Sequence, residues 1–261
     1  MKTLVLANQK GGVGKSALAV QYAYYLALEE ERRVIVLDLD HQRNTSSALK
    51  KGGFATVSEL TSSQLLRDPD AVVEPAPFVL VAGDRELIKM EKFAGEHNAY
   101  ATNLYNFLGR ISNEYDVCII DTNPNPDIRQ LASLVVTDYV LSPLQLNQEA
   151  IDGIGDLLNH DNIGIRKIQK TLNEKLHFLG VLPNLVEPTP FQKENLRDLS
   201  AAYAKLMIPL DKGFAAIKKT TAIPEAQAAG LPVWHLKKTS ARSAWAHIRP
   251  IFQRLSKNME I

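Results

Sequence analysis

The segment from Lys10 to Ser16 combines glycines and lysines in a spacing that suits phosphate binding. It reads Lys-Gly-Gly-Val-Gly-Lys-Ser. Backbone N–H groups can point at an anion where no side chains intervene, and Gly11, Gly12 and Gly14 provide such positions. The alternative is a glycine-rich turn with an exposed lysine, but the ordered string favours a loop that binds the phosphates of a nucleotide.

The elements around this loop and two of its side chains fit the same chemistry. A short apolar run, Leu4–Ala7, precedes it and a helical pattern, Ala17–Ala27, follows it. The N-terminus of that helix places a partial positive charge where phosphate would bind. Lys15 can reach the β- and γ-phosphates, and the Ser16 hydroxyl can ligate Mg²⁺. The predicted ligand is therefore ATP with Mg²⁺, and the predicted nucleotide contacts here are Gly11, Gly12, Val13, Gly14, Lys15, Ser16 and Ala17.

Three carboxylates stand where apolar strands are predicted to end. Asp38 and Asp40 follow the run from Val34, and alternation along an extended chain puts both on one side. Asp121 ends four apolar residues, which is the Walker B form, so it is predicted to hold Mg²⁺ through water or to bond Ser16. Ligands of open parallel sheets bind beyond the carboxyl ends of the strands, so these acids are expected beside the phosphate loop. The alternative for each is an acidic loop start.

Alternating apolar runs and helical patterns predict an α/β fold with a doubly wound, mostly parallel sheet, in one domain spanning residues 1–261. The predicted strands are Thr3–Ala7, Val34–Leu39, Phe78–Ala82, Val117–Asp121, Tyr139–Ser142, His177–Pro183 and Lys205–Ile208. The predicted helices are Ser16–Glu30, Ala99–Asn113, Ile128–Val136, Ala150–Leu158, Lys167–Leu176, Pro190–Tyr203 and Ala241–Leu255. The segment Thr56–Glu74 is predicted to contain either one short helix or two.

Composition narrows the class of protein. The chain has 261 residues, of which 45% are hydrophobic, and no apolar run approaches the length of a membrane span. It enters a strand directly, with no pattern of a secretory leader. The single cysteine, Cys118, excludes an internal disulfide and fits a buried position in a strand. These features favour the cytoplasm.

The phosphate loop resembles that of a known family. The string K-G-G-x-G-K-[ST] after the first strand is similar to the deviant Walker A motif of the ParA/MinD family of P-loop ATPases. Gln9 stands at the first glycine position of the general pattern, and Lys10 is an additional lysine. The resemblance implies that Lys10 reaches the nucleotide held by a partner subunit in an ATP-dependent homodimer. A solvated loop lysine is the alternative.

The resemblance extends to other segments. Asp38-Leu39-Asp40-His41-Gln42 resembles the family's D-x-D-P-Q motif, with His41 in place of proline. By this resemblance Asp40 orients the attacking water, so that Lys10, Lys15 and Asp40 are the catalytic set. Asp38 supports the Mg²⁺ shell, with Ser16 and Asp121 as the other metal residues. His41 is interpreted as a structural substitution.

Further along the chain the resemblance is looser. The segment Thr122–Asp127 corresponds to a switch loop that senses the γ-phosphate, and Arg129 is a candidate contributor to it. Asn184 is a candidate for hydrogen bonds to the adenine ring, because an amide offers a donor and an acceptor. Pro209 is expected in the base pocket through backbone contacts.

Charge is distributed unevenly along the chain. From Phe191 to Ile261 there are 12 Lys/Arg against 5 Asp/Glu, although the whole chain has a net charge of +1. An anionic partner or simply solvated helix faces would explain this. By resemblance to short ParA proteins without an N-terminal helix-turn-helix domain, the partner is nonspecific DNA, bound by the ATP-state dimer on the nucleoid and released when a ParB-like centromere-binding protein stimulates slow hydrolysis. The candidate phosphate contacts are Lys218, Lys219, Lys237, Lys238, Arg242, Arg249 and Arg254.

Two alternatives belong to the same superfamily. A MinD-like membrane-cycling ATPase needs an amphipathic C-terminal helix, and Trp245, Ile248, Phe252 and Leu255 recur at helical spacing. Packing of that face on the core is the stronger interpretation, and Pro250 disfavours a continuous membrane helix. An amidating enzyme of the cobyrinic-acid-synthase type shares the phosphate loop and stays open.

Overall fold

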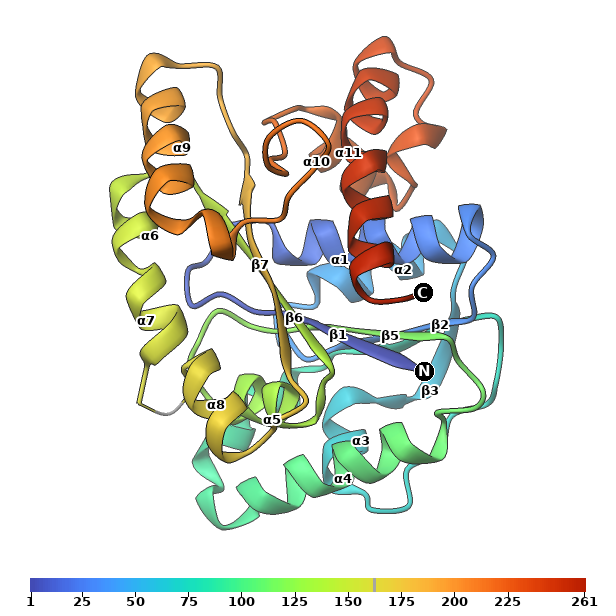
Figure 1. Ribbon diagram of the computed structural model, residues 1–261. Helices are drawn as coiled ribbons and strands as arrows, with labels where there is room; N and C mark the ends of the chain where they lie inside the picture. The colour runs from blue at the N-terminus through green and yellow to red at the C-terminus, as the bar shows by residue number, and fades with distance from the viewer. Residues whose placement is uncertain (162) are drawn as a thin grey trace.

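The computed structural model describes residues 1–161 and 163–261, which form one parallel sheet of seven strands flanked by helices (Figure 1). The spatial order of the strands is β3-β4-β2-β5-β1-β6-β7. The prediction of a doubly wound α/β fold is confirmed, and every strand pair is parallel. The strands are β1 (Lys2–Leu6), β2 (Val34–Asp38), β3 (Thr56–Thr61), β4 (Phe78–Ala82), β5 (Val117–Asp121), β6 (Tyr139–Gln145) and β7 (His177–Asn184).

Helices cover both faces of the sheet. Figure 1 shows α1, α2, α10 and α11 on one face and α3, α4, α5 and α8 on the other, with α6, α7 and α9 near the β6–β7 edge. The α-helices are α1 (Lys15–Tyr24), α2 (Asn44–Gly52), α3 (Ser62–Arg67), α4 (His97–Arg110), α5 (Ile128–Val136), α6 (Gln148–Asp152), α7 (Ile154–Asn159), α8 (Ile165–Thr171), α9 (Pro190–Tyr203), α10 (Ala222–Ala229) and α11 (Thr239–Asn258). Single-turn and 3₁₀ segments connect several of them.

The central strands are buried on both faces, which explains their continuous apolar sequences. Every residue of β2, β4 and β5 is buried. Cys118 in β5 is fully buried, and this burial raises the pKa of its thiol. The register pairs Leu6 with Asp121 and Asp38 with Asp121, so the ends of β1, β5 and β2 lie side by side. This arrangement brings the phosphate loop and the predicted acids to one edge.

One predicted strand is wrong. Lys205–Ile208 contains a 3₁₀ turn, Ala204–Leu206, and only Met207 forms an isolated bridge, with Val181 of β7. The seventh strand is instead β3, which lies in the segment that had been left open between helices. It lies at the edge of the sheet with all of its residues exposed or half-buried, so its sequence lacks the apolar run of the central strands.

Several helices differ from their predicted bounds. The first one ends as α-helix at Tyr24 and continues as a π-helix, Tyr25–Glu29. The predicted helix Ala150–Leu158 is two short helices that meet at Gly153. α8 ends at Thr171, before the predicted end at Leu176. Two further helices, α2 and α10, have no counterpart among the predicted helices, and both line the site described below.

The apolar face of the C-terminal helix packs on the core. Ile248, Phe252 and Leu255 are buried, and the Trp245 ring lies 5.9 Å from that of Tyr25. Pro250 lies inside this continuous helix. The apolar face that a membrane anchor would need is therefore packed against the core of this chain. Among the described residues, no helix is both long enough and apolar enough to cross a membrane.

Candidate functional site: a nucleotide cavity at the strand ends

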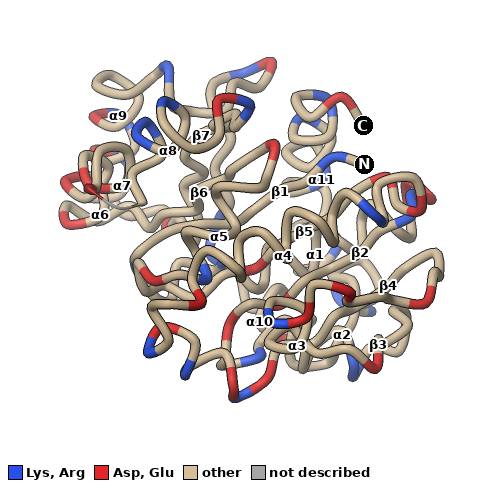
Figure 2. The backbone as a smooth tube through the Cα atoms, turned by 90° about the horizontal axis from the view of Figure 1, so that it is seen from below, with Lys and Arg blue, Asp and Glu red and all other residues tan. Residues whose placement is uncertain are grey.

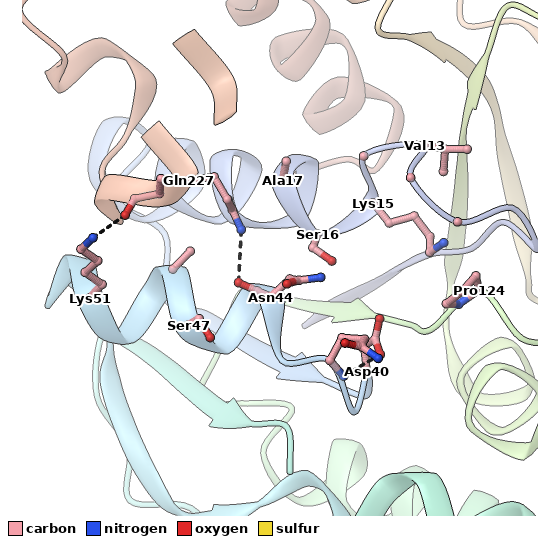
Figure 3. A pocket seen from close by; sticks show the side chains of 16 residues that line it. Val13, Lys15, Ser16, Ala17, Asp40, Asn44, Ser47, Lys51, Pro124 and Gln227 are labelled. Carbon is pink, nitrogen blue, oxygen red and sulfur yellow. Dashed lines mark hydrogen bonds between the residues drawn. The ribbon is translucent and has the colours of Figure 1, made fainter. Parts of the chain in front are cut away.

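A cavity of about 600 Å³ opens at the carboxyl ends of β1, β2 and β5 (Figure 3). The phosphate loop forms one wall, the loop after β2 and the start of α2 form another, and α10 closes the far end. Figure 3 shows Lys15, Ser16 and Asp40 along this space. The lining residues are Gly11, Gly12, Val13, Gly14, Lys15, Ser16, Ala17, Asp40, Gln42, Asn44, Ser47, Ala48, Lys51, Pro124, Gln227 and Ala228.

The phosphate loop has the backbone geometry that its glycines predict. Gly12 and Gly14 have φ angles of +75° and +92°, a region that glycine adopts without strain. A Cβ atom at Gly14 would lie 2.3 Å from Nδ2 of Asn184. Gly14 is also the residue that precedes α1, and no side chain caps the first N–H groups of that helix. These donors are available to an anion.

The Lys15 side chain crosses the base of the loop. Its Nζ donates to the carbonyl oxygens of Asn8, at 3.0 Å, and Lys10, at 3.3 Å. Burial lowers the pKa of Lys15, while the charges of Asp121 and Asp40 act in the opposite direction. A partly dehydrated ammonium group interacts more strongly with phosphate oxygens than a solvated one. The geometry therefore suits the predicted role of this lysine.

Lys10 is held by its own chain. Its Nζ lies 2.7 Å from Oε2 of Glu149 and 3.3 Å from Oδ1 of Asn147, both in the segment that begins α6. The Lys10 side chain is 35% exposed and that of Glu149 is 84% exposed. Exposed ion pairs contribute little to stability, so this contact is easily exchanged for another anion. The predicted action of Lys10 on a partner's nucleotide stays a prediction.

Asp121 offers an unused acceptor beside the Ser16 hydroxyl. Its Oδ2 accepts a 2.7 Å hydrogen bond from the Thr45 hydroxyl, whereas its buried Oδ1 has no partner among the described residues. Burial raises the pKa of Asp121, opposed by the Ser16 and Thr45 hydroxyls and by Lys15. A divalent cation would satisfy the free oxygen and favour the charged carboxylate. The donor set of Ser16 and Asp121 fits Mg²⁺, which binds proteins through few carboxylates and takes its remaining ligands from phosphate and water.

The described residues offer no prebuilt metal cage. No group of three or more His, Cys, Asp or Glu side chains among them is placed to hold a metal ion.

Asp38 is tied to the start of α2. Its Oδ2 accepts hydrogen bonds from the Ser46 backbone, at 2.8 Å, and the Ser46 hydroxyl, at 2.6 Å. Its Oδ1 accepts from the backbone N–H of Asp40 at 3.1 Å. Burial and the charge of Asp121 raise the pKa of Asp38, and the bonds from Ser46 oppose this shift. Asp38 does not line the cavity, so its direct contribution to a metal shell stays a prediction, whereas its contacts fix the second wall of the site.

Asp40 points into the cavity from the loop after β2 (Figure 3). Its Oδ1 accepts a 2.9 Å hydrogen bond from the backbone of Gln42. The next residue, His41, has its Nδ1 3.5 Å from that oxygen and 3.1 Å from Nη1 of Arg129. A carboxylate at this place can accept a proton from water or orient it toward a phosphorus atom.

The two predicted adenine contacts lie outside the cavity wall. Asn184 is 3% exposed, and its Nδ2 donates to the carbonyl oxygen of Val13 at 2.8 Å. Its Oδ1 has no partner among the described residues. Pro209 is exposed and forms an isolated bridge with Phe214. Asn184 therefore supports the phosphate loop from below, and the adenine roles of both residues stay predictions.

The seven predicted DNA contacts fall into two groups. Lys218, Lys237 and Arg242 form no ion pair with any residue in ranges 1–161 and 163–261. The other four are paired within the chain, which reduces their availability to DNA phosphates. These pairs are Lys219 with Glu187, Lys238 with Glu225, Arg249 with Glu29 and Arg254 with Asp211.

Two parts of the site were not predicted from the sequence: the polar start of α2 and the contribution of α10. Thr45 bonds Asp121, and Ser46 bonds Asp38, so both hydroxyls organise the acids. Gln227 of α10 donates from Nε2 to the carbonyl oxygen of Asn44 at 3.2 Å. The run Asn44-Thr45-Ser46-Ser47, shortly after Asp38 and Asp40, was the available signal, because hydroxyl side chains near carboxylates commonly donate hydrogen bonds to them. No comparable signal marked Gln227.

Comparisons with known proteins agree with this geometry. Residues 1–178 match a family model described as an AAA domain. Protein IncC of Escherichia coli is 36% identical over 277 residues, which cover 100% of this chain and 71% of IncC. The chromosome-partitioning ATPase Soj of Treponema pallidum is 29% identical over 242 residues, or 89% of this chain and 88% of Soj. The chain belongs to the ParA/MinD family of ATPases. It is most similar to the ParA-type partition ATPases within that family.

A solved structure supports the fold of this ParA-type chain. The ATP complex of McdA(D38A) from Cyanothece superimposes with a TM-score of 0.78 at 20% identity, covering 100% of this chain and 97% of McdA. At this level of identity the likeness is one of fold. The comparison therefore supports the fold of seven parallel strands with flanking helices.

Proposed function

We propose that this ParA-type chain is a DNA-partition ATPase that dimerises around Mg²⁺-ATP, binds nonspecific DNA in that state and leaves it after hydrolysis. The observation that carries the proposal is the cavity in which the phosphate loop, Lys15 and Asp40 converge, with Lys10 at its margin. In this proposal the protein acts in the cytoplasm as one domain, bound to the nucleoid in the ATP state.

The residues of this chain have separable roles in hydrolysis. The loop N–H groups and Lys15 bind the β- and γ-phosphates and stabilise charge that develops on them. Asp40 orients the attacking water. Ser16 and Asp121 would hold Mg²⁺, which would supply positive charge beside the phosphates. Lys10 must leave Glu149 to reach a nucleotide in the partner subunit, so hydrolysis depends on dimerisation and is slow in the isolated chain.

The DNA surface is assigned to the unpaired basic residues near α11. A groove of about 300 Å³ lies between the segment containing Lys218 and the N-terminal half of α11. Hydroxyl groups of Thr220, Ser240 and Ser243 line it beside Lys218 and Lys219. Lysines and hydroxyls are common phosphate contacts that carry no sequence preference. A dimer presents this surface twice, which makes binding steeply dependent on ATP and on salt.

A partner that stimulates hydrolysis has a candidate surface close to Lys10. Figure 2 shows acidic residues gathered over α6 and α7. Glu149, Asp152 and Asp156 are exposed there. A basic segment of a ParB-like activator would complement this surface and compete for Glu149.

The test is fluorescence anisotropy with nonspecific duplex DNA in ATP, ADP or no nucleotide, repeated across a salt series. We expect salt-sensitive binding in ATP alone, and its loss in Lys10→Ala. Absence of DNA binding in every nucleotide state, with ATP-driven dimerisation confirmed by light scattering, would refute the DNA function. Liposome sedimentation would then test the membrane-cycling alternative.

A matched pair of variants tests the location of the DNA surface. One replaces the three unpaired residues Lys218, Lys237 and Arg242 with Gln, and the other replaces the paired Lys219, Lys238 and Arg249 with Gln. Both remove three positive charges. We expect the first variant to reduce the slope of log affinity against log salt by about 3 for each subunit in contact with DNA, and the second by less. Equal slopes would contradict the assignment.

A further inference from the structure

A buried arginine joins the two loops that flank the nucleotide cavity. The Arg129 side chain, at the start of α5, is 3% exposed. Its Nε lies 3.2 Å from both carboxylate oxygens of Asp127, and its Nη2 bonds one of the same oxygens. Its remaining terminal nitrogen, Nη1, lies 3.1 Å from Nδ1 of His41. Burying a guanidinium group is costly unless such partners satisfy it, so the contacts define a single arrangement.

The chemistry of this contact fixes the state of the imidazole. A guanidinium group only donates hydrogen bonds, so Nδ1 of His41 must accept and the ring proton must reside on Nε2. Nε2 lies 3.0 Å from the side-chain amide of Gln42, which we therefore orient with its oxygen toward the ring. His41 is thus a neutral acceptor between Arg129 and the loop of Asp40.

The bridge joins the two loops whose residues Asp40 and Pro124 line the cavity. His41 belongs to the loop after β2, and Arg129 follows the loop after β5. These strands are neighbours in the sheet, with Asp38 and Asp121 in register. Asp40, adjacent to His41, and Pro124, in the loop after β5, both line the cavity.

A second contact stiffens the arginine side of the bridge. Asn123 is fully buried, and its Nδ2 donates to Oδ2 of Asp127 at 2.8 Å. Asp127 also caps α5 by accepting from the backbone of Arg129 at 3.0 Å. The loop after β5 is therefore a rigid support, and the His41 contact transfers that rigidity to the loop that carries Asp40.

We propose that His41 and Arg129 are positioning residues that hold Asp40 in place for ATP hydrolysis. This inference rests on the proposed ATPase reaction. A displacement of about 1 Å in a catalytic group can cost about 100-fold in rate, so a lost bridge lowers kcat more than it changes nucleotide binding.

The experiment compares His41→Asn with His41→Leu. The Asn side chain places an oxygen where Nδ1 of histidine stands and can accept from Arg129, whereas Leu fills similar space and cannot accept. We expect His41→Leu to lower kcat about 10-fold or more, with the Kd for ATP within about twofold of wild type. His41→Asn should recover most of the rate.

Amide hydrogen exchange of the nucleotide-free protein provides a readout that does not depend on turnover. His41→Leu should accelerate exchange in residues 39–47, and His41→Asn should not. Equal rates for Leu, Asn and wild type, or equal losses in Leu and Asn, would overturn the positioning role. If the wild type binds ATP but hydrolyses none, the proposed ATPase fails, and exchange that is also unchanged in His41→Leu would overturn the bridge itself.

Discussion

The replacement Ser46→Ala tests whether Asp38 serves to anchor α2. The Ser46 hydroxyl donates to Asp38 at 2.6 Å and accepts from the backbone N–H of Gly83 at 2.9 Å. Both contacts are buried. Alanine removes a hydrogen bond to an acidic group, which contributes about 1.5–3 kcal/mol, and leaves the Gly83 donor without a partner, which costs about 1–3 kcal/mol. With partial relaxation we expect a loss of about 3 kcal/mol in the free energy of unfolding.

Urea unfolding followed by circular dichroism measures this loss. Ser47→Ala is the matched control, because Ser47 is exposed on the same turn of α2, and its free energy of unfolding should change by at most about 0.5 kcal/mol. A loss below about 1 kcal/mol in Ser46→Ala, or equal losses in the two variants, would refute the anchor. Such a result would favour the predicted role of Asp38 in supporting the Mg²⁺ shell over a role in anchoring α2.

Three further predictions concern the nucleotide site. Lys15→Gln should weaken ATP binding about 10- to 100-fold, because a charged hydrogen bond contributes about 1.5–3 kcal/mol; calorimetry measures this, and unchanged affinity would contradict it. Glu149→Gln removes the ion pair that holds Lys10, so light scattering should detect ATP-dependent dimers at a lower protein concentration than in wild type. If the variant needs a higher concentration to dimerise, Lys10 does not leave Glu149 to contact a partner's nucleotide. Burial raises the pKa values of Asp38 and Asp121 above their values in the unfolded chain, so their protonation favours the folded state. The nucleotide-free protein should therefore lose stability in urea unfolding as the pH rises from about 4, near the pKa of an unfolded aspartate, to about 7, near the folded pKa of Asp38. The loss is about 1.4 kcal/mol for each unit of pKa difference, and Asp121→Asn should reduce it. An equal loss in that variant would exclude these groups as its cause.

Local sequence was sufficient for the parts of the site that depend on neighbours in the chain. The loop from Lys10 to Ser16 and the acids Asp38 and Asp121 could be located because strand, glycine loop and helix follow one another directly. The order of the strands in the sheet then brought them together. In open parallel sheets, residues at the carboxyl ends of neighbouring strands lie together, so a loop and acids at these positions predict a shared site.

The missed parts depend on contacts between distant segments. α2 begins after Arg43 with a φ of 61° and no side-chain cap, so its start carries no usual signal. The contact of α10 with α2 could not be predicted because its partners, Gln227 and Asn44, lie 183 residues apart in the sequence. Lys205–Ile208 has the composition of a strand but lies beyond β7 with a single bridge. Propensity alone could not decide whether it would pair.

Long-range pairing also decides how the basic residues can be used. The sequence places Arg249 and Arg254 on one helix as apparent free cations. In the structure, Arg249 pairs with Glu29 and Arg254 pairs with Asp211. No periodicity along the chain predicts such partners, because each pair joins segments that the sequence separates by 40 residues or more.

The burial of Cys118 gives this chain a practical property. It is the only cysteine, lies fully inside the sheet, and has a thiol whose pKa is raised by that burial. Maleimides and alkylating reagents attack thiolates that solvent can reach, so we expect them not to label Cys118 in the native protein. A single cysteine introduced at an exposed place, such as Ser47 on the cavity rim, would carry a fluorophore or spin label at one defined position. Conformational cycles could then be followed without first removing the natural thiol.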